Sequence, residues 1–246
     1  MPVDPFSALF AELGRLSNLH CLERELARRG YRLVAGVDEV GRGCLAGPVM
    51  AAAVILPEDF VVPGLDDSKR LDAEARERLE PLVRRRAVAI GVGHVEASQI
   101  DERNILRASL LAMRMAVDAL SPQPEFLLVD AVTIPGVARP QLPLVHGDAL
   151  CASIAAASIV AKVARDRVLQ ELARRYPVYG FERHKGYGTE EHWQALRQFG
   201  PCPEHRLSFD GVIAGTGDPP PDPGRRSERR RGPRRRKPAP SPPSLV

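Results

Sequence analysis

The stretch that decides the fold is residues 36–48, which read Gly36-Val-Asp38-Glu39-Val-Gly41-Arg42-Gly43-Cys-Leu-Ala-Gly-Pro48. It lies between two apolar runs, at 33–37 and 49–56, which predict two short strands joined as a hairpin. Two adjacent carboxylates at the end of a buried strand are unfavourable, because burying unpaired charge costs several kcal/mol. The pair Asp38 and Glu39 therefore suggests a compensating cation, most simply a bound divalent metal.

The turn that follows the two acids has the composition of a phosphate-binding turn. Gly41 and Gly43 allow the backbone to turn sharply and to come close to a ligand, and the planar guanidinium of Arg42 suits a phosphate group. Together with the acids, this turn favours metal-dependent phosphoryl chemistry. Taken alone, the stretch is equally compatible with a polar hairpin turn whose glycines only supply positive φ.

The overall composition is that of a globular protein. The chain has 246 residues, of which 44% are hydrophobic and 27% charged. No segment approaches the ~18 consecutive apolar residues of a membrane span, and the N-terminus lacks the basic and apolar regions of a signal peptide. The four cysteines are scattered and form no C-x-x-C pair, which argues against a zinc site and against a disulfide framework. We expect a cytoplasmic protein that does not contact membranes.

The positive charge of the chain is concentrated near its C-terminus. Residues 217–246 hold nine of the basic side chains and three acids, a net charge of +6 within a total of +4, so the rest of the chain carries −2. From Gly215 on, Pro, Gly, Ser and Arg dominate without apolar periodicity, which predicts a disordered basic tail. Such a tail could tether the protein to nucleic acid or be only a solvated extension.

The periodicity of apolar residues predicts an α/β fold. Helical spacing indicates helices at 5–29, 72–86 (with Asp72 as its N-cap), 105–120, 149–175 and 190–199, and short apolar runs indicate strands at 33–38, 48–56, 87–95, 125–130 and 142–146. This order predicts a mixed β-sheet flanked by helices, with a helical C-terminal part. We divide the chain into an N-terminal helical extension (1–31), a catalytic domain (32–214) and the disordered tail (215–246).

Three predicted strand ends carry acids, namely Asp38 with Glu39, Asp130, and Asp148. Acids at the ends of neighbouring strands can converge at one sheet edge. Four carboxylate ligands suit two Mg²⁺ or Mn²⁺ ions that activate water at a phosphodiester. Adjacent strand residues point to opposite faces, so Asp38 and Glu39 share a site only if the strand bends or ends there. Alternatively, Asp148 caps the long helix and Asp130 is a turn acid.

Two later segments have plausible structural and functional interpretations. The small residues of 152–162 predict a helix packed closely on the sheet, and Lys162 and Asp166 have the i,i+4 spacing of an ion pair. The sequence His184-Lys185-Gly186-Tyr187-Gly188-Thr189 combines positive charge, a flexible backbone and an aromatic ring. It is typical of a surface that binds a sugar-phosphate backbone, although a mobile basic loop would look similar.

Several motifs in one order resemble the type 2 ribonucleases H, the ribonuclease HII family. The resemblance covers about residues 32–213. Besides residues 37–48, it is carried by Asp67-Ser68-Lys69, Leu127-Leu128-Val129-Asp130, Gly147-Asp148, the run 156–166, His184-Lys185-Gly186-Tyr187 and His205-Arg206-Leu207-Ser208-Phe209. It implies an RNase H-like fold. It also implies an endonuclease that hydrolyses the RNA strand of RNA–DNA hybrids, including single ribonucleotides in duplex DNA.

The resemblance also implies roles for individual residues. Asp38, Glu39, Asp130 and Asp148 would be the catalytic acids that bind two Mn²⁺ or Mg²⁺ ions. Gly41, Arg42 and Gly43 would read the ribose 2′-OH, and Tyr187 would stack on the adjacent sugar. Cleavage 5′ of the ribonucleotide would leave 3′-OH and 5′-phosphate ends, and we expect a monomer. The remaining contacts to the substrate would come from Ser68, Lys69, Ser158, Lys162, Arg165 and Lys185.

The sequence departs from the family pattern at three positions. Cys44 replaces the proline that usually follows Gly-Arg-Gly, Ala131 replaces the glycine after the acid at 130, and His146 stands where a lysine is common. Two other functions remain open. A resolvase-like metal nuclease would use the acids without needing the 2′-OH, and a nucleic-acid binding module would use the basic tail alone.

Overall fold

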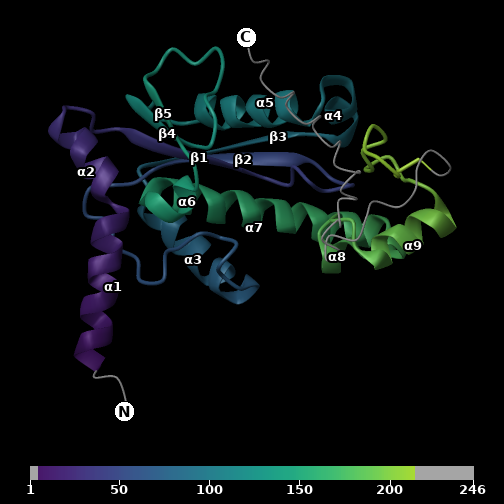
Figure 1. Cartoon of the computed structure of the whole chain (residues 1–246), viewed down its shortest axis with the longest axis horizontal. Coiled ribbons are helices and arrows are strands. Elements are labelled where there is room, and N and C mark those ends of the chain that lie inside the picture. Colours follow the sequence, from purple (N-terminus) through teal and green to yellow (C-terminus); the bar gives the residue numbers. More distant parts are fainter. Residues whose placement is uncertain (1–4, 214–246) are drawn as a thin grey trace, which may run out of the picture.

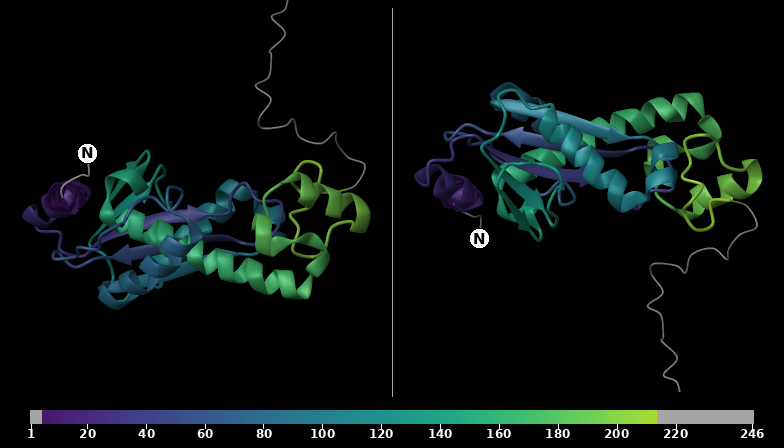
Figure 2. Two further views of the ribbon diagram at one scale, coloured as in Figure 1. Left: turned by 90° about the horizontal axis from the view of Figure 1, so that it is seen from below. Right: turned by 90° about the horizontal axis from the view of Figure 1, so that it is seen from above.

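The structure, a computed structural model, describes residues 5–213. The predicted disordered tail at 215–246 lies outside the described residues. The body is elongated, with helix α1 (Pro5–Leu19) at one end and the C-terminal helices at the other (Figures 1 and 2).

The centre of the fold is a five-stranded mixed sheet in the order β3-β2-β1-β4-β5. Strands β1, β2 and β3 are antiparallel neighbours, whereas β4 pairs parallel to β1 and β5 parallel to β4. The α/β fold with a mixed sheet and the hairpin at the two adjacent acids are thus confirmed. The strands are β1 (Val34–Val40), β2 (Val49–Ile55), β3 (Ala89–Val95), β4 (Phe126–Asp130) and β5 (Gln141–Leu144).

Helices cover both faces of the sheet (Figure 1). Helix α5 (Ile105–Asp118) packs on one face through a core that includes Val37, Val49 and Val129. Helix α7 (Ala152–Arg175) packs on the other face, together with α3 (Ala73–Arg86), through a second core. As predicted, the small residues of α7 bring it close to the sheet, since a Cβ added at Gly36 would lie 2.1 Å from the carbonyl carbon of Ser153.

The structure corrects two predicted helices, because each is divided. The helix predicted at 5–29 is α1 followed by α2 (Cys21–Arg28), and the break is at His20, whose buried ring lies against Phe60. The helix predicted at 149–175 is the short α6 (Gly147–Leu150) followed by α7, with Cys151 in an extended conformation between them. Apolar periodicity continues across both breaks, so the sequence pattern did not reveal them.

Short helices that we did not predict complete the fold. Helix α4 (Ala97–Arg103) precedes α5, and a 3₁₀ turn (Pro177–Tyr179) and α8 (Phe181–His184) follow α7. Helix α9 (Glu190–Phe199) was predicted correctly and is capped by Thr189. The elements after α7 enclose their own apolar cluster around Phe181, Trp193 and Leu196.

The N-terminal helices pack on the body of the protein. Leu16 and Leu19 are buried in the same core as α7. Glu23 of α2 accepts hydrogen bonds from the backbone N–H and the hydroxyl of Ser153, at 2.8 and 2.7 Å, and so caps the first turn of α7. No helix within residues 5–213 combines the length and the apolar character needed to cross a lipid bilayer.

Candidate active site

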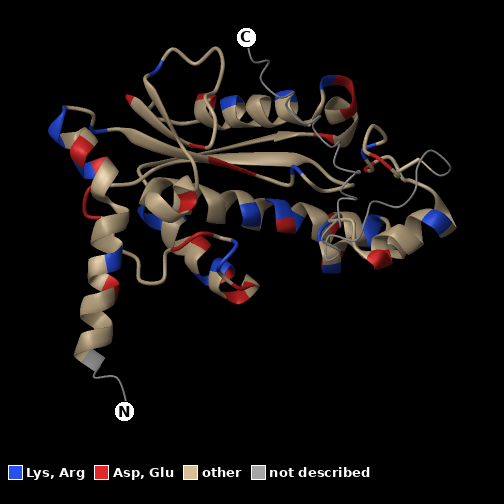
Figure 3. Cartoon of the chain, in the orientation of Figure 1, with Lys and Arg blue, Asp and Glu red and all other residues tan. Residues whose placement is uncertain are grey.

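The four predicted acids come to one edge of the sheet. The register pairs Val37 of β1 with Val129 of β4, and the next residue of each strand is an acid. Asp38 and Asp130 are therefore neighbours on two parallel strands. Asp148 lies in α6, directly after β5. Asp38 and Asp148 are almost fully buried, whereas Glu39 and Asp130 are partly buried. Figure 3 shows acidic positions on the central strands, with basic and acidic positions alternating along α7.

Asp38 is a buried carboxyl group that feels the charge of Lys69 only from a distance, since Lys69 is bound to Asp148. One carboxylate oxygen accepts a hydrogen bond from the backbone N–H of Glu39 at 2.8 Å. No lysine or arginine in the described part of the chain forms an ion pair with Asp38. Burial, reinforced by the charges of Glu39 and Asp130, raises the pKa of Asp38 to about 8, although a hydrogen bond from Ser158 opposes the shift. Without a cation, this carboxyl group is therefore largely protonated at neutral pH.

Glu39 remains within β1, which continues to Val40 paired with Met50. The expectation that the strand ends between the two acids is therefore wrong, and adjacent strand residues point to opposite faces. Glu39 is nevertheless close to the other acids, because its charge acts on Asp38 and the charge of Asp130 acts on it. The Glu39 carboxylate accepts a hydrogen bond from Arg42 at 3.1 Å. Burial raises its pKa even though Arg42 opposes the shift.

Asp130 is held by the loop that carries Asp148. Its carboxylate accepts the backbone N–H of Gly147 at 2.8 Å. Burial and the neighbouring charge of Asp148 raise the pKa of Asp130, and the bond from Gly147 opposes them. A Cβ at Gly147 would lie 2.6 Å from Cδ1 of Ile154 in α7, so a side chain there would displace the end of Ile154.

Asp148 does not cap the long helix, because α6 and Cys151 separate it from α7. Its carboxylate instead binds the ammonium group of Lys69 at 2.9 Å. Burial alone would raise the pKa of Asp148, but Lys69 outweighs burial and holds the pKa below its usual value. Asp67, which lies next to Asp148, has its pKa raised by burial and by that neighbouring carboxylate.

Whether the four acids can bind divalent ions depends on their ligand atoms and on their present hydrogen-bond partners. Within residues 5–213, no three Asp, Glu, His or Cys side chains form a group that could hold a metal as they stand. Glu39, Asp130 and Asp148 are each turned toward a donor of the protein itself. The ligand atoms are nevertheless hard carboxylate oxygens, and buried Asp38 forms no ion pair with any of the described residues. The set fits Mg²⁺ or Mn²⁺ if Glu39 and Asp148 exchange their basic partners for an ion.

Two buried arginines hold the turn between β1 and β2. Arg165 of α7 donates to the carbonyl oxygens of Ala46, Pro48 and Lys185 at 2.9–3.0 Å. Arg206 donates to the carbonyl oxygens of Gly47 and Arg42 at 2.9–3.1 Å. Both side chains are fully buried, and burial lowers the pKa of Arg206 to about 10.

Arg165 therefore cannot make the direct substrate contact that the resemblance implied, because its charged group is enclosed by the two loops. Gly41 is required beside it: its φ is +90°, and a Cβ there would lie 2.2 Å from Nε of Arg165. Gly43 has no comparable constraint. Arg206 belongs to the motif at 205–209, but its sequence context indicated no role for it.

The remaining predicted contacts are distributed around the acids. Ser68 and Ser158 are buried, and their hydroxyl groups lie 2.7 Å apart. Lys69 is exposed apart from its bond to Asp148. Lys162 forms the predicted ion pair with Asp166, at 2.6 Å, and only 18% of its side chain is exposed. A contact of Lys162 with phosphate would therefore compete with this ion pair.

Tyr187 lies near the turn after β1. The carbonyl oxygen of Gly186 accepts a hydrogen bond from the N–H of Leu45 at 2.8 Å, and this bond joins the loop of Tyr187 to the loop between β1 and β2. The Tyr187 side chain is 44% exposed. Burial of its hydroxyl group, with the neighbouring Cys44 and Asp166, raises the pKa of Tyr187 although Arg165 opposes the shift. An exposed ring beside the Gly-Arg-Gly turn is available for stacking.

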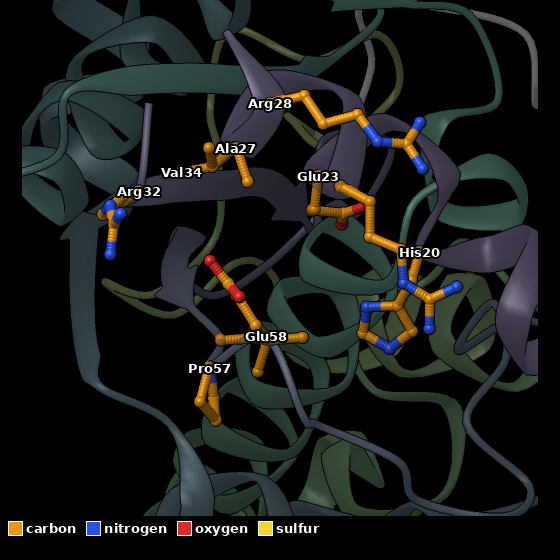
Figure 4. Close-up of a pocket in the computed structure, with 10 residues that line it drawn as sticks. His20, Glu23, Ala27, Arg28, Arg32, Val34, Pro57 and Glu58 are labelled. Atoms are coloured by element: carbon orange, nitrogen blue, oxygen red, sulfur yellow. The ribbon is translucent and has the colours of Figure 1, made fainter. Parts of the chain in front are cut away.

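A separate cavity of about 430 Å³ lies at the other end of β1. Figure 4 shows Glu23 and Arg28 of α2 around it, with His20 at the break before α2 and Glu58 on the loop after β2. None of the four acids lines this cavity. It therefore does not belong to the candidate active site.

Comparison with known families places most of the chain in one of them. The family model described as Ribonuclease HII matches residues 35–212. A protein of Geobacillus kaustophilus (strain HTA426) named Ribonuclease HII is 60% identical over 198 residues, which cover 80% of this chain and 76% of that protein. The range matched by the family model contains all four acids, the Gly-Arg-Gly turn and Tyr187.

Solved structures show the same fold. The ribonuclease H2 of Pyrococcus horikoshii OT3 superposes with a TM-score of 0.62 at 27% sequence identity, covering 73% of this chain and 94% of that one. A structure described as Bst-RNase HIII in complex with Mn²⁺ superposes with a TM-score of 0.57 at 24% identity, covering 76% and 70%. At that identity the second likeness concerns the fold alone.

Proposed function

Since the chain belongs to the ribonuclease HII family and is an endoribonuclease, we propose that it hydrolyses the RNA strand of RNA–DNA hybrids and cuts at single ribonucleotides in duplex DNA. The observation that carries this proposal is the buried carboxyl group of Asp38 beside Glu39 and Asp130, which forms no ion pair with a basic side chain within residues 5–213. A site of this kind is stable in its charged form only with a cation.

The four acids are the proposed metal ligands and catalytic acids. When bound, two Mg²⁺ or Mn²⁺ ions would neutralise the carboxylates, activate a water and stabilise the leaving oxygen. The chain's own part is to hold the ligands: Gly147 orients Asp130, and Ser158 donates to Asp38. Lys69 keeps Asp148 charged until an ion or a substrate takes its place.

The substrate is read by two loops that contact each other. Gly41, Arg42 and Gly43 are proposed to contact the ribose 2′-OH, the group that distinguishes RNA from DNA at a given step. Tyr187 is proposed to stack on the sugar beyond the ribonucleotide. The side chains of Ser68, Lys69, Ser158 and Lys185 remain candidate contacts to the sugar-phosphate backbone. Lys162, which is partly exposed beside its ion pair with Asp166, is a further candidate contact, whereas the guanidinium group of Arg165 is enclosed by the protein.

The expected products follow from attack by water on the phosphate at the 5′ side of the ribonucleotide. Cleavage there leaves a 3′-OH on the upstream DNA and a 5′-phosphate on the ribonucleotide. We also propose that the enzyme works as a monomer in the cytoplasm. The four free cysteines, three of them buried, suit a reducing compartment.

The test is cleavage of a labelled DNA duplex with one ribonucleotide, beside an all-DNA duplex of the same sequence, with Mg²⁺ or Mn²⁺. We expect one cut, 5′ of the ribonucleotide, and none in all-DNA. Asp38→Asn should abolish cleavage. Asp118→Asn is the matched control, because Asp118 is an exposed acid at the end of α5 that pairs with Arg114, and it should cut like the wild type.

Two results would replace this proposal. Equal cutting of both duplexes would indicate a resolvase-like nuclease that does not read the 2′-OH. Binding of both duplexes without cleavage, under either metal, would indicate a nucleic-acid binding module. Neither alternative requires the Gly-Arg-Gly turn to lie beside Tyr187.

A further inference from the structure

Three buried histidines lie beneath the Tyr187 loop, and the proposed chemistry does not use them. His192 of α9 and His205 are almost completely buried, as is His184 at the end of α8. Their rings pack with Phe181 and Tyr179, and the rings of His184 and His192 are stacked with centroids 4.4 Å apart. Buried polar rings of this kind need hydrogen-bond partners, and the partners determine where each ring carries its proton.

The hydrogen bonds of His192 and His205 form a series in which each donor and each acceptor can be assigned. Nδ1 of His192 lies 2.9 Å from the carbonyl oxygen of Tyr187, which can only accept, so this nitrogen carries a proton. Nδ1 of His205 lies 3.0 Å from the backbone N–H of Cys202, which can only donate, and 3.3 Å from the carbonyl oxygen of Cys202. The shorter bond, from the N–H, places the proton of His205 on Nε2. The two Nε2 atoms lie 3.0 Å apart, and His205 therefore donates to His192.

This assignment requires both rings to be neutral. A second proton on either ring would break the chain, since on His192 it would place two N–H groups against each other across the 3.0 Å contact. Burial, with the charge of nearby histidines, lowers the pKa of His205 to about 4, and burial likewise lowers that of His192 to about 4. Both rings are therefore neutral near physiological pH, and the chain of bonds is intact.

The backbone of His205 is joined to the Gly-Arg-Gly turn. The segment 204–206 lies antiparallel to 45–47: Arg206 N–H donates to Leu45 and Gly47 N–H donates to Glu204, each at 2.8 Å. The side chain of the next residue, Arg206, binds the carbonyl oxygens of Arg42 and Gly47. The two neighbours of His205 therefore hold the segment that follows the turn, and Arg206 reaches the turn at Arg42, while the ring of His205 contacts His192.

His184 supports the same loop from the other side. Its Nε2 donates to the carbonyl oxygen of Tyr179 at 2.6 Å, and its Nδ1 accepts the N–H of Gly186 at 3.2 Å. The carbonyl of Tyr187 also accepts the N–H of Thr189 at 2.9 Å. The loop that presents Tyr187 is thus held at several backbone atoms, and the bond from His192 connects the carbonyl of Tyr187 to the turn through His205.

We propose that His192 and His205 are positioning residues, which form an imidazole bridge that fixes Tyr187 relative to the Gly41–Gly43 turn. This inference rests on the proposed function, in which the turn reads the 2′-OH and Tyr187 stacks on the next sugar. With the bridge intact, both contacts fall on one dinucleotide step. Without it, the two loops are still joined by the bond from Leu45 to Gly186 and by Arg165, but the carbonyl of Tyr187 loses its link to the turn and the two contacts fall less often on the same step.

The first test compares three variants on two substrates, a duplex with one ribonucleotide and a continuous RNA–DNA hybrid. His192→Leu removes the donor to Tyr187 and should lower kcat/KM on the single-ribonucleotide duplex by about fivefold more than on the hybrid, the effect of removing one hydrogen bond. His192→Asn retains a donor at the Nδ1 position and should restore most of this preference. Leu196→Ala is the matched control, since it opens a cavity in the same helix and cluster.

The second test is a double-mutant cycle with Tyr187→Ala. If the bridge acts through Tyr187, His192→Leu should have little further effect on substrate preference once the ring of Tyr187 is removed. An undiminished effect in that background would overturn the inference. It would equally be overturned if His192→Leu and Leu196→Ala lowered activity on both substrates to the same extent.

A third measurement does not depend on cleavage. Hydrogen exchange of the free protein should rise in both 184–189 and 42–47 for His192→Leu, and in neither segment for Leu196→Ala. Unchanged exchange in the two segments would overturn the bridge. If the wild type failed to distinguish RNA from DNA, the proposed function would fall, while this exchange comparison would still decide whether the bridge exists.

Discussion

At the scale of the residue, the site contains residues whose burial or backbone conformation is unfavourable for folding. Asp38 is a buried carboxyl group near two other acids, and Ala131 has a φ of +58°, a left-handed conformation that a residue with a Cβ rarely adopts. Such residues persist only where surrounding structure holds them. Ala131 directly follows Asp130, so the strained residue sets the direction in which the chain leaves a proposed metal ligand.

We predict that Asp38→Asn raises the thermal stability of the metal-free protein. The pKa of Asp38 is about 8 when folded and near the ordinary 3.8 when unfolded. The folded state therefore binds the proton more tightly, and the wild type loses stability as pH rises from about 4 through 8. Asparagine has no such ionisation, so at pH 8 and above the gain should be on the order of 1–3 kcal/mol.

The measurement is the melting temperature against pH in EDTA. The gain of Asp38→Asn over the wild type should be small near pH 4 and should grow toward pH 8. Mn²⁺ should raise the melting temperature of the wild type more than that of the variant. A gain in melting temperature that did not vary with pH would show that folding does not raise the pKa of Asp38.

We predict that Ala131→Gly stabilises the protein by roughly 0.5–1 kcal/mol, because glycine adopts the left-handed conformation without steric cost. Ala73→Gly is the control. Ala73 is an exposed alanine with a helical backbone at the start of α3, and there glycine should be neutral or destabilising. Chemical denaturation of the three proteins checks the prediction, and a loss of stability in Ala131→Gly would contradict it.

At the scale of the element, α7 connects most parts of the site. Its first half contacts β1 through small side chains and places Ser158 beside Asp38. Its second half carries Arg165 to the two loops that are proposed to read the substrate. The position of α7 along the sheet therefore affects the acids and the loops together. Its first turn is capped by Glu23, from a helix outside the family resemblance.

We predict that Glu23→Leu lowers stability by about 1–3 kcal/mol, because it leaves the Ser153 N–H and hydroxyl groups at the start of α7 without their acceptor. Glu25→Leu is the matched control. Glu25 lies on the same helix but only pairs with the exposed Arg28 and Arg29, and such pairs contribute little. Urea unfolding of the two variants compares them, and equal losses would show that the cap is not important.

At the scale of the whole molecule, charge is divided between a near-neutral body and a basic C-terminal stretch outside the described residues. The body carries −2 over residues 1–216, and residues 217–246 carry +6. A body with this charge has little long-range attraction for DNA. Nonspecific affinity would then come largely from the basic stretch, because binding to phosphates is dominated by released counterions.

We predict that truncation at Gly215 weakens duplex binding at low salt and makes the dependence of log K on log salt less steep. Each phosphate contact that is lost on truncation should reduce the magnitude of this slope by about 0.9. The measurement is binding of the single-ribonucleotide duplex in Ca²⁺ across a salt series, with Asp38→Asn to prevent cleavage. An identical slope for both lengths would show that the stretch takes no part in binding.

The sequence by itself determined the strands, the mixed α/β fold and the residues of the candidate site. These follow from local patterns, because apolar periodicity reports which face of an element is buried, and the four acids occur in motifs that resemble one family. The hairpin at 36–48, the ion pair of Lys162 and the cap at Asp72 were all predicted from neighbours in the sequence, and the structure contains them.

Only the tertiary structure decided how those residues act, because that depends on contacts between distant segments. The family resemblance implied that Arg165 contacts the substrate, but the loops at 46–48 and 185 enclose it. Asp148 looks like a helix cap, yet Lys69, which is 79 residues away in the chain, binds it. The breaks at His20 and Cys151, and the link from His205 to Tyr187, likewise arise from packing that no local pattern records.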